Sequence, residues 1–97
     1  MGMQVDLLVT LQPRMDRVSE LHESLLQLRE ASLAEPGCLY YRLARAQPPS
    51  QVFYLLERWA DVQALETHEG TLHFVEGVEQ VQACCLSVEI QKLVWLE

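Results

Sequence analysis

The sequence is poor in cations, and this shortage excludes several classes of function. Of its 97 residues, seven are Lys or Arg and 14 are Asp or Glu, which gives a net charge of −7. Because the chain has no cluster of basic residues, a nucleic-acid surface is not expected. Anionic membrane surfaces would repel the chain for the same reason. The acidic excess indicates solubility rather than a particular function.

Cysteine is also scarce. Cys38, Cys84 and Cys85 are an odd set without regular spacing, which does not predict a disulfide framework. If Cys84 and Cys85 lie in one strand, they point to opposite faces and are poorly placed to bond each other. The expectation is therefore reduced thiols packed as small apolar groups in a cytoplasmic protein.

Several motif classes are missing as well. The chain has no Gly-rich phosphate loop, no CxxC pair and no Ser/His/Asp set, so nucleotide binding, dithiol chemistry and triad hydrolysis are not predicted. No apolar run approaches the length of a membrane span, and no basic region precedes the first apolar run as in a signal peptide. Without a repeat or a linker, residues 1–97 are predicted to form one domain.

The first third of the chain predicts a strand and then a helix. Apolar residues alternate from Val5 to Leu11, and Pro13 ends this strand. Between residues 14 and 34 the apolar period becomes helical, which predicts one helix face on a sheet. Asp16 or Ser19 can cap the start of this helix. Its predicted buried side consists of Val18, Leu21, Leu25, Leu28, Leu26 and Leu33.

The middle of the chain predicts a hairpin-like pair of strands. The strands cover residues 38–45 and 52–59, and the proline-containing turn 47–50 separates them. In the first of these strands, one face is predicted to carry Leu39, Tyr41 and Leu43. In the second, one face is predicted to carry Phe53, Leu55, Glu57 and Trp59. Because both faces of this pair are largely apolar, we expect the sheet to be covered on both sides.

The last third predicts an interrupted helix and a final strand. Asp61 can cap a helix through about Glu69, Gly70 interrupts it, and Thr71 can cap a continuation through about Gln80. The predicted inward residues of the two pieces are Val62, Leu65, Glu69, Leu72, Val75 and Val78. The final strand is predicted from the alternation of Cys84, Leu86, Val88, Ile90, Val94 and Leu96.

The resulting order, β-α-β-β-α-β, predicts an α+β, ferredoxin-like fold with an antiparallel four-stranded sheet. Two helices cover only one face of such a sheet. The other face also carries apolar side chains, so packing against a second copy is the simplest closure. We therefore predict a homodimer, in which the long last strand acts as an arm that reaches the partner.

Two signatures in the sequence resemble those of the antibiotic biosynthesis monooxygenase family. The first is Glu35-Pro36-Gly37-Cys38-Leu39 followed by Tyr41. The second is Leu55-Leu56-Glu57-Arg58-Trp59, then Ala64-Leu65 and His68, then His73-Phe74. The resemblance implies a dimeric α+β barrel with a pocket between sheet and helices. It also implies oxygenation of a quinol or polycyclic aromatic substrate by molecular oxygen, without metal or flavin.

Other members of this family degrade haem or isomerise small phosphorylated carbonyl compounds, and the fold does not select among these reactions. Haem-degrading relatives carry a histidine four residues after the phenylalanine of the second signature, where this chain has Val78, so haem ligation by that route is not expected. Some oxygenase members hold substrate or oxygen with an asparagine. This chain contains no asparagine, so a direct copy of that mechanism is not expected.

His68 and Glu57 are the predicted catalytic residues. Imidazole has an unperturbed pKa near 6.5, which suits a general base. A quinol that loses its proton becomes an electron-rich anion that itself reduces oxygen, so the reaction needs no metal. Glu57 lies on an otherwise apolar strand face and is suited to orient His68. The alternative is that both residues form only structural hydrogen bonds.

The predicted substrate-binding residues are Trp59, Phe74, Tyr41, Tyr54 and His73. Aromatic side chains can stack on a flat substrate, although each can equally serve the core or a dimer interface. His73 is predicted at the mouth of the pocket. A metal site is not predicted, because an unbroken helix separates His68 and His73 by about 140° and no third ligand is evident.

Two further functions stay open from the sequence. An isomerase of a small carbonyl compound can use the same base without oxygen, and Arg42, Arg45 and Arg58 are the candidates for binding a phosphate group. A non-catalytic module for ligand binding or stress response is the other possibility. It predicts that His68 is buried and satisfied, or that the pocket is closed.

Overall fold

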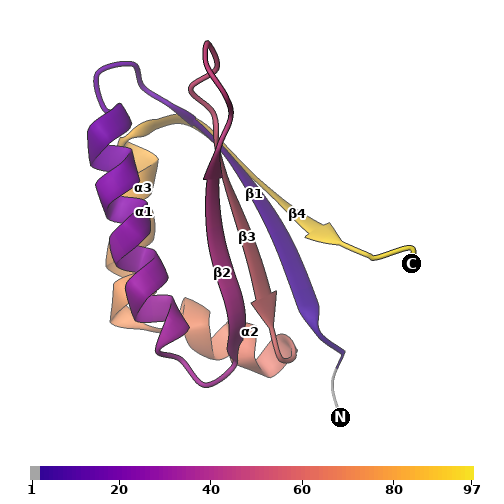
Figure 1. The fold of residues 1–97 in the computed structure, drawn as a ribbon. Coiled ribbons are helices and arrows are strands. Elements are labelled where there is room, and N and C mark those ends of the chain that lie inside the picture. Colours follow the sequence, from indigo (N-terminus) through magenta and orange to yellow (C-terminus); the bar gives the residue numbers. More distant parts are fainter. Residues whose placement is uncertain (1–2) are drawn as a thin grey trace.

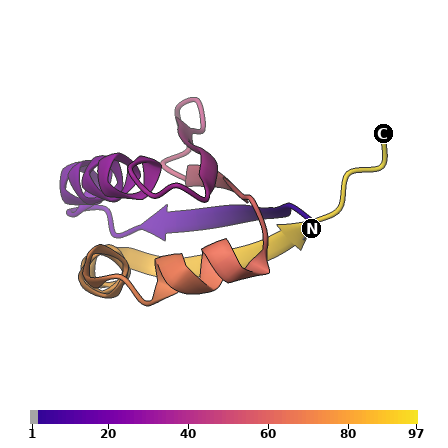
Figure 2. The ribbon, with the colours of Figure 1, turned by 90° about the horizontal axis from the view of Figure 1, so that it is seen from below.

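The computed structural model describes residues 3–97 as one antiparallel sheet with helices on one side (Figures 1 and 2). The elements are β1 (Val5–Pro13), α1 (Val18–Leu33), β2 (Cys38–Arg45), β3 (Phe53–Trp59), α2 (Val62–Glu69), α3 (Leu72–Ala83) and β4 (Cys85–Leu93). The strand order is β2-β3-β1-β4. The predicted ferredoxin-like fold is confirmed. No helix in the described residues is long and apolar enough to cross a membrane.

The core lies between the sheet and its helices, because the strands alternate their side chains between the two faces. Phe53, Leu55, Glu57 and Trp59 of β3 are buried on one face. The helix α1 lies against β2 and α3, and its buried leucines belong to the same core. The buried residues of β1, β3 and α1 are Leu7, Val9, Leu11, Phe53, Leu55, Trp59, Leu21, Leu25 and Leu28. The opposite face of the sheet has no helix over it (Figure 2).

The start and the outer side of α1 differ from the sequence prediction. Arg17 occupies the N-cap position and makes no side-chain capping bond, so neither Asp16 nor Ser19 caps the helix. Leu26 and Leu33 are 48% and 39% exposed. Leu26 follows the buried Leu25 and Leu33 follows the buried Ser32, so each is rotated by about 100° around the helix from a buried position. The row that meets the sheet is therefore narrower than predicted.

A β-bulge at the start of β2 places Leu39 outside the core. Cys38 pairs with Trp59 and Tyr40 with Arg58, so two β2 steps oppose a single β3 step. Leu39 is consequently 47% exposed, whereas Tyr41 is buried.

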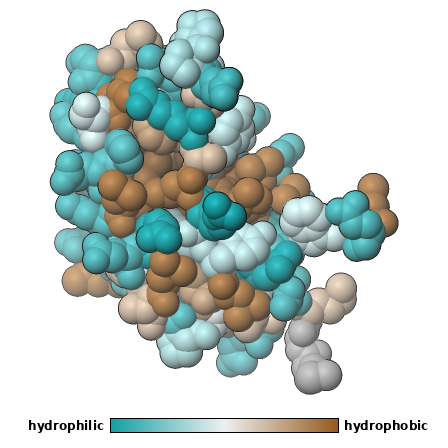
Figure 3. Space-filling model, in the orientation of Figure 1, coloured by the Kyte–Doolittle hydropathy of each residue, from teal (hydrophilic) through white to brown (hydrophobic). Residues whose placement is uncertain are grey.

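The predicted inward residues of α2 and α3 are largely wrong. The predicted final strand is present as β4, although it ends at Leu93 and does not continue to Leu96. The buried positions in the two helices are Leu65, His68 and Val81. Cys84 ends α3 and is not part of β4. The side chains that are exposed instead are Val62, Leu72, Val75, Leu86, Ile90, Val94 and Leu96. Since β4 is an edge strand, its outer residues lack a covering layer, and hydrophobic groups form a band across this view of the surface (Figure 3).

Gly77 brings α3 close to α1. A Cβ atom at this position would lie 2.4 Å from Cδ2 of Leu28, which is closer than non-bonded carbon atoms come. The missing side chain therefore allows the two helices to pack against each other along the groove described below.

Candidate functional site

A carboxylate shared by two histidines forms the centre of the candidate site. Oε2 of Glu35 lies 2.6 Å from Nδ1 of His68. The same oxygen lies 2.8 Å from Nε2 of His73. His68 is 2% exposed, whereas the side chains of Glu35 and His73 are 13% and 31% exposed. The cluster therefore runs from the core to the surface.

The turn after α1 positions Glu35. Its N–H donates to the carbonyl of Ser32, and its own carbonyl accepts from the N–H of Cys38. Gly37 packs directly on α2, since a Cβ there would lie 2.4 Å from Cβ of Ala64. The Pro-Gly turn that follows α1 thus lies in direct contact with α2, the helix that carries His68.

The break between α2 and α3 brings His73 to the same carboxylate. Thr71 donates its hydroxyl hydrogen to the carbonyl of His68 over 2.7 Å and accepts a hydrogen bond from the N–H of Phe74 over 3.2 Å. Thr71 is thereby the N-cap of α3, and Asp61 is the N-cap of α2, as predicted. Because the helix is interrupted, the angular offset expected for an unbroken helix does not apply. The two histidines meet, although they are five residues apart.

Aromatic rings enclose His68. The ring centroid of Trp59 lies 4.2 Å away, that of Phe74 5.0 Å and that of Tyr41 6.4 Å. Three of the predicted aromatic residues are therefore brought together around the histidine. Tyr54 is not, because it alternates with Phe53 and Leu55 and lies on the sheet face opposite the helices.

Glu57 bonds Trp59 and not His68. Its Oε1 accepts a hydrogen bond of 2.9 Å from Nε1 of Trp59. Burial is the main factor that raises the pKa of Glu57 to about 7, with the negative charges of Glu69 and Glu35 adding to it, while the Trp59 bond acts in the opposite direction. The predicted pairing of Glu57 with His68 is not formed. Glu35 takes that place.

The raised pKa of Glu57 makes stability depend on pH. An unfolded chain releases this proton at the ordinary pKa of 4.5, but the folded protein holds it to about 7. The associated stability is thus complete below pH 4.5 and is lost as the pH rises through 7. When the pH is raised from 5 to 8, the free energy of unfolding should fall for the wild type because Glu57 ionises. In Glu57→Gln, which has no such group, the fall over the same range should be smaller by about 2–3 kcal/mol. Urea unfolding at both pH values measures this, and parallel pH profiles would contradict it.

Burial also suppresses the acidity of two thiols, Cys38 and Cys85. It is the main factor that raises the pKa of Cys38 to about 11 and that of Cys85 to about 11. Both groups are therefore thiols at neutral pH, which is a poor state for a nucleophile. Burial raises the pKa of Tyr41 as well, with the charge of Glu57 adding to it.

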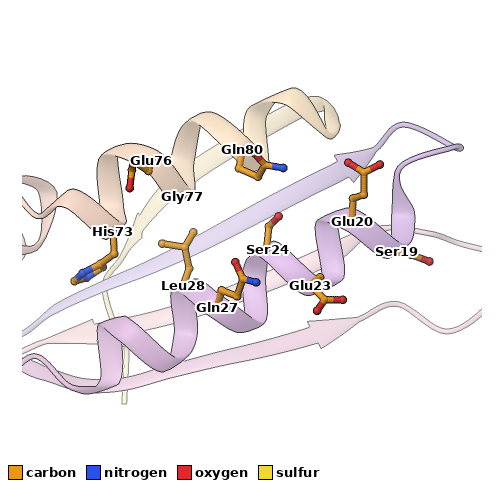
Figure 4. A pocket seen from close by; sticks show the side chains of 10 residues that line it. All are labelled: Ser19, Glu20, Glu23, Ser24, Gln27, Leu28, His73, Glu76, Gly77 and Gln80. Atoms are coloured by element: carbon orange, nitrogen blue, oxygen red, sulfur yellow. The ribbon is translucent and has the colours of Figure 1, made fainter.

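A groove between α1 and α3 leads to His73 (Figure 4). It has a volume of about 580 Å³. Its lining residues are Ser19, Glu20, Glu23, Ser24, Gln27, Leu28, His73, Glu76, Gly77 and Gln80. Hydroxyl, amide and carboxylate groups surround an apolar floor, and the lining contains no Lys or Arg. His68 does not line this groove, so His73 is the histidine that a ligand there reaches.

The arginines gather elsewhere. A pocket of about 360 Å³ between α1 and β2 contains Arg29, Arg42 and Arg45. Arg58 instead pairs with Asp6 over 2.8 Å. The pocket also includes Phe53, which lies four residues, or about 13 Å, along β3 from Glu57. This arginine pocket and the α1–α3 groove that reaches His73 share no lining residue.

The shared carboxylate fixes the tautomers of both rings. A carboxylate oxygen only accepts hydrogen bonds, so the ring nitrogen of each histidine that faces Glu35 carries hydrogen. In the neutral rings, Nε2 of His68 and Nδ1 of His73 are then unprotonated. Each of these nitrogens is able to accept a proton, as the base of an oriented acid–base pair does.

Residues 5–80 match the family model of the antibiotic biosynthesis monooxygenases. The chain belongs to this family. An isomerase of (4S)-4-hydroxy-5-phosphonooxypentane-2,3-dione from Yersinia enterocolitica is 28% identical over 75 residues, which are 77% of this chain and 78% of the isomerase. The structure of PA3566 from Pseudomonas aeruginosa is 33% identical, with a TM-score of 0.89 and coverage of 100% of this chain and 98% of that one. Rv0793 from Mycobacterium tuberculosis is 27% identical, with a TM-score of 0.90 and coverage of 98% and 97%.

In this antibiotic biosynthesis monooxygenase family member, the two sequence signatures meet at the histidine cluster. Glu35 begins the first signature, and His68 and His73 belong to the second. Sequence reasoning assigned no role to Glu35. The available signal was its position directly before the Pro-Gly pair at a helix end, where the chain turns back toward the sheet.

Proposed function

We propose that this protein is a monooxygenase that acts on a quinol or a related hydroxylated aromatic compound and needs neither metal nor flavin. The observation that carries the proposal is the carboxylate of Glu35, which lies 2.6 Å from His68 and 2.8 Å from His73. This arrangement holds two imidazoles in fixed tautomers at the end of a groove. It supplies the base that cofactor-free oxygenation requires.

The three residues have different roles in the proposed mechanism. His73 accepts a proton from the substrate hydroxyl at Nδ1, because it is the accessible ring. Glu35 stabilises the imidazolium that forms, as a carboxylate does beside a catalytic histidine. His68 is the base predicted from the sequence. It holds Glu35 from the buried side and is the second site that can carry the proton.

The redox balance closes without a further reductant. The quinol supplies all four electrons that reduce molecular oxygen: two are lost when the quinol becomes a quinone, and two when a ring C–H becomes C–OH. One oxygen atom is incorporated into the ring as a hydroxyl group, and the other leaves as water. The products are a hydroxyquinone and water, so the substrate itself is the reductant. Protons removed by the histidines return in the water molecule.

The lining of the groove favours a neutral hydroxylated ligand. Its serine and glutamine side chains can bond hydroxyl groups, and Leu28 and Gly77 offer an apolar floor. Glu20, Glu23 and Glu76 disfavour an anionic ligand. The second candidate is an isomerase of a small carbonyl compound, which the relationship to the Yersinia enterocolitica isomerase favours. Its phosphate group would meet carboxylates in this groove.

Oxygen uptake with a panel of hydroquinones and anthrones tests the proposal. We expect the wild type to consume oxygen in step with product and to stop under anaerobic conditions. Turnover that persists without oxygen would support the isomerase instead. If the wild type consumes oxygen no faster than either His68→Ala or His73→Ala, the proposed mechanism is wrong.

We also propose that the protein is a cytoplasmic homodimer. Three free cysteines fit a reducing compartment. The open sheet face and the exposed apolar side chains Ile90, Val94 and Leu96 fit a contact with a second copy. Analytical ultracentrifugation should give twice the chain mass at micromolar concentration. A stable monomer at that concentration would overturn this proposal.

A further inference from the structure

We propose that Glu35, His68 and His73 also form a binding site for a divalent transition-metal ion, with Zn²⁺ as the best match. The inference rests on the geometry of the cluster and not on the reaction proposed above. One carboxylate oxygen and two ring nitrogens lie within 4.8 Å of one another. They come from the turn after α1, from α2 and from the first turn of α3, so three separate elements converge on one point.

The donor set suits zinc. Two histidines and one carboxylate are the protein ligands of many zinc sites that keep a fourth position open. Zinc binds such atoms at about 2.0–2.2 Å, which separates tetrahedral ligands by about 3.3 Å. The present nitrogen–oxygen distances are 2.6 and 2.8 Å, so the ligands need to spread by about 0.5–0.7 Å. Glu35 and His73 are partly exposed, which gives them room to do so.

The surroundings suit a cation. In the described part of the chain, Glu35 forms no ion pair with Lys or Arg, and its partners are the two imidazoles alone. The net charge of −7 favours a cation over an anion. Metal binding also requires that each ring move its proton to the nitrogen that faces away from Glu35. The bound ion would then occupy the base, so it should inhibit the oxygenation proposed above.

Cobalt(II) is the probe for this site, because its visible absorption reports coordination without any need for turnover. We expect one Co²⁺ per chain, displaced by Zn²⁺. Glu35→Gln and His73→Ala should each weaken binding at least about tenfold. His22→Ala is the matched control, because His22 is an exposed histidine of α1 outside the cluster, and it should bind as the wild type does.

Circular dichroism of each variant confirms that it is folded. Glu35 and His73 are partly exposed, so at least one of the two variants should retain the fold. The proposal is overturned by non-saturable binding, by equal binding to the wild type and both cluster variants, or by a thiolate-to-cobalt band that places the ion on a cysteine. Since binding is measured without substrate, this result is independent of whether the oxygenase proposal holds.

Discussion

Replacing Glu35 with glutamine should lower the rate of oxygen uptake by about 10²–10⁴-fold, the range that a positioned acid–base group contributes. Glutamine has nearly the same size but no negative charge. Its amide oxygen can still accept a hydrogen bond from each ring at the position that Oε2 occupies now, so the substitution removes the charge and keeps the acceptor. The imidazolium that forms on His73 then lacks its counter-charge.

The distribution of this loss between kcat and KM distinguishes the proposed role from a purely structural one. Glu35 does not line the α1–α3 groove, so Glu35→Gln should lower kcat and leave KM within about threefold. Gln27→Ala, in the groove wall, should do the reverse by raising KM. His22→Ala serves as a control on an exposed histidine. A Glu35→Gln protein that retains more than a third of the wild-type kcat would rule out the shared carboxylate as part of the base.

Local signals account for what the sequence predicted correctly. Asp61 and Thr71 cap their helices through bonds to the N–H groups of residues three positions on, and such motifs are contained in a few neighbouring residues. The alternation along β3 fixed which side chains share a face with Trp59. The order of these elements was then sufficient for the ferredoxin-like fold.

Long-range geometry accounts for what the sequence did not predict. Glu35 and His68 are 33 residues apart, and only the packing of the Pro-Gly turn on α2 brings them together. Glu57 is closer to His68 in the sequence than Glu35 is, but its carboxylate accepts a hydrogen bond from the indole N–H of Trp59. The exposure of Leu72 and Val75 depends on how far α3 extends over the sheet, and helical periodicity carries no information about that.

Replacing Trp59 with alanine should reduce the free energy of unfolding by about 3–5 kcal/mol, the range for truncating a large buried aromatic residue. Trp59 is fully buried, and it packs on His68 with a centroid distance of 4.2 Å. The change also removes the only side-chain donor that bonds Glu57 in the described structure. A loss of this size is a large part of the 5–15 kcal/mol that typically stabilises a domain.

Two comparisons separate the packing of the ring from the hydrogen bond. Trp59→Phe keeps an aromatic ring but leaves Glu57 without its hydrogen-bond donor. Its loss of unfolding free energy should therefore be smaller than that of Trp59→Ala. This loss should grow as the pH rises, because Glu57 then ionises without a donor. Met15→Ala, at a side chain that is 74% exposed, should change stability by no more than about 0.5 kcal/mol. Urea unfolding followed by circular dichroism, at one protein concentration, measures all three. If Trp59→Ala costs no more than Met15→Ala, Trp59 does not support the aromatic enclosure of His68.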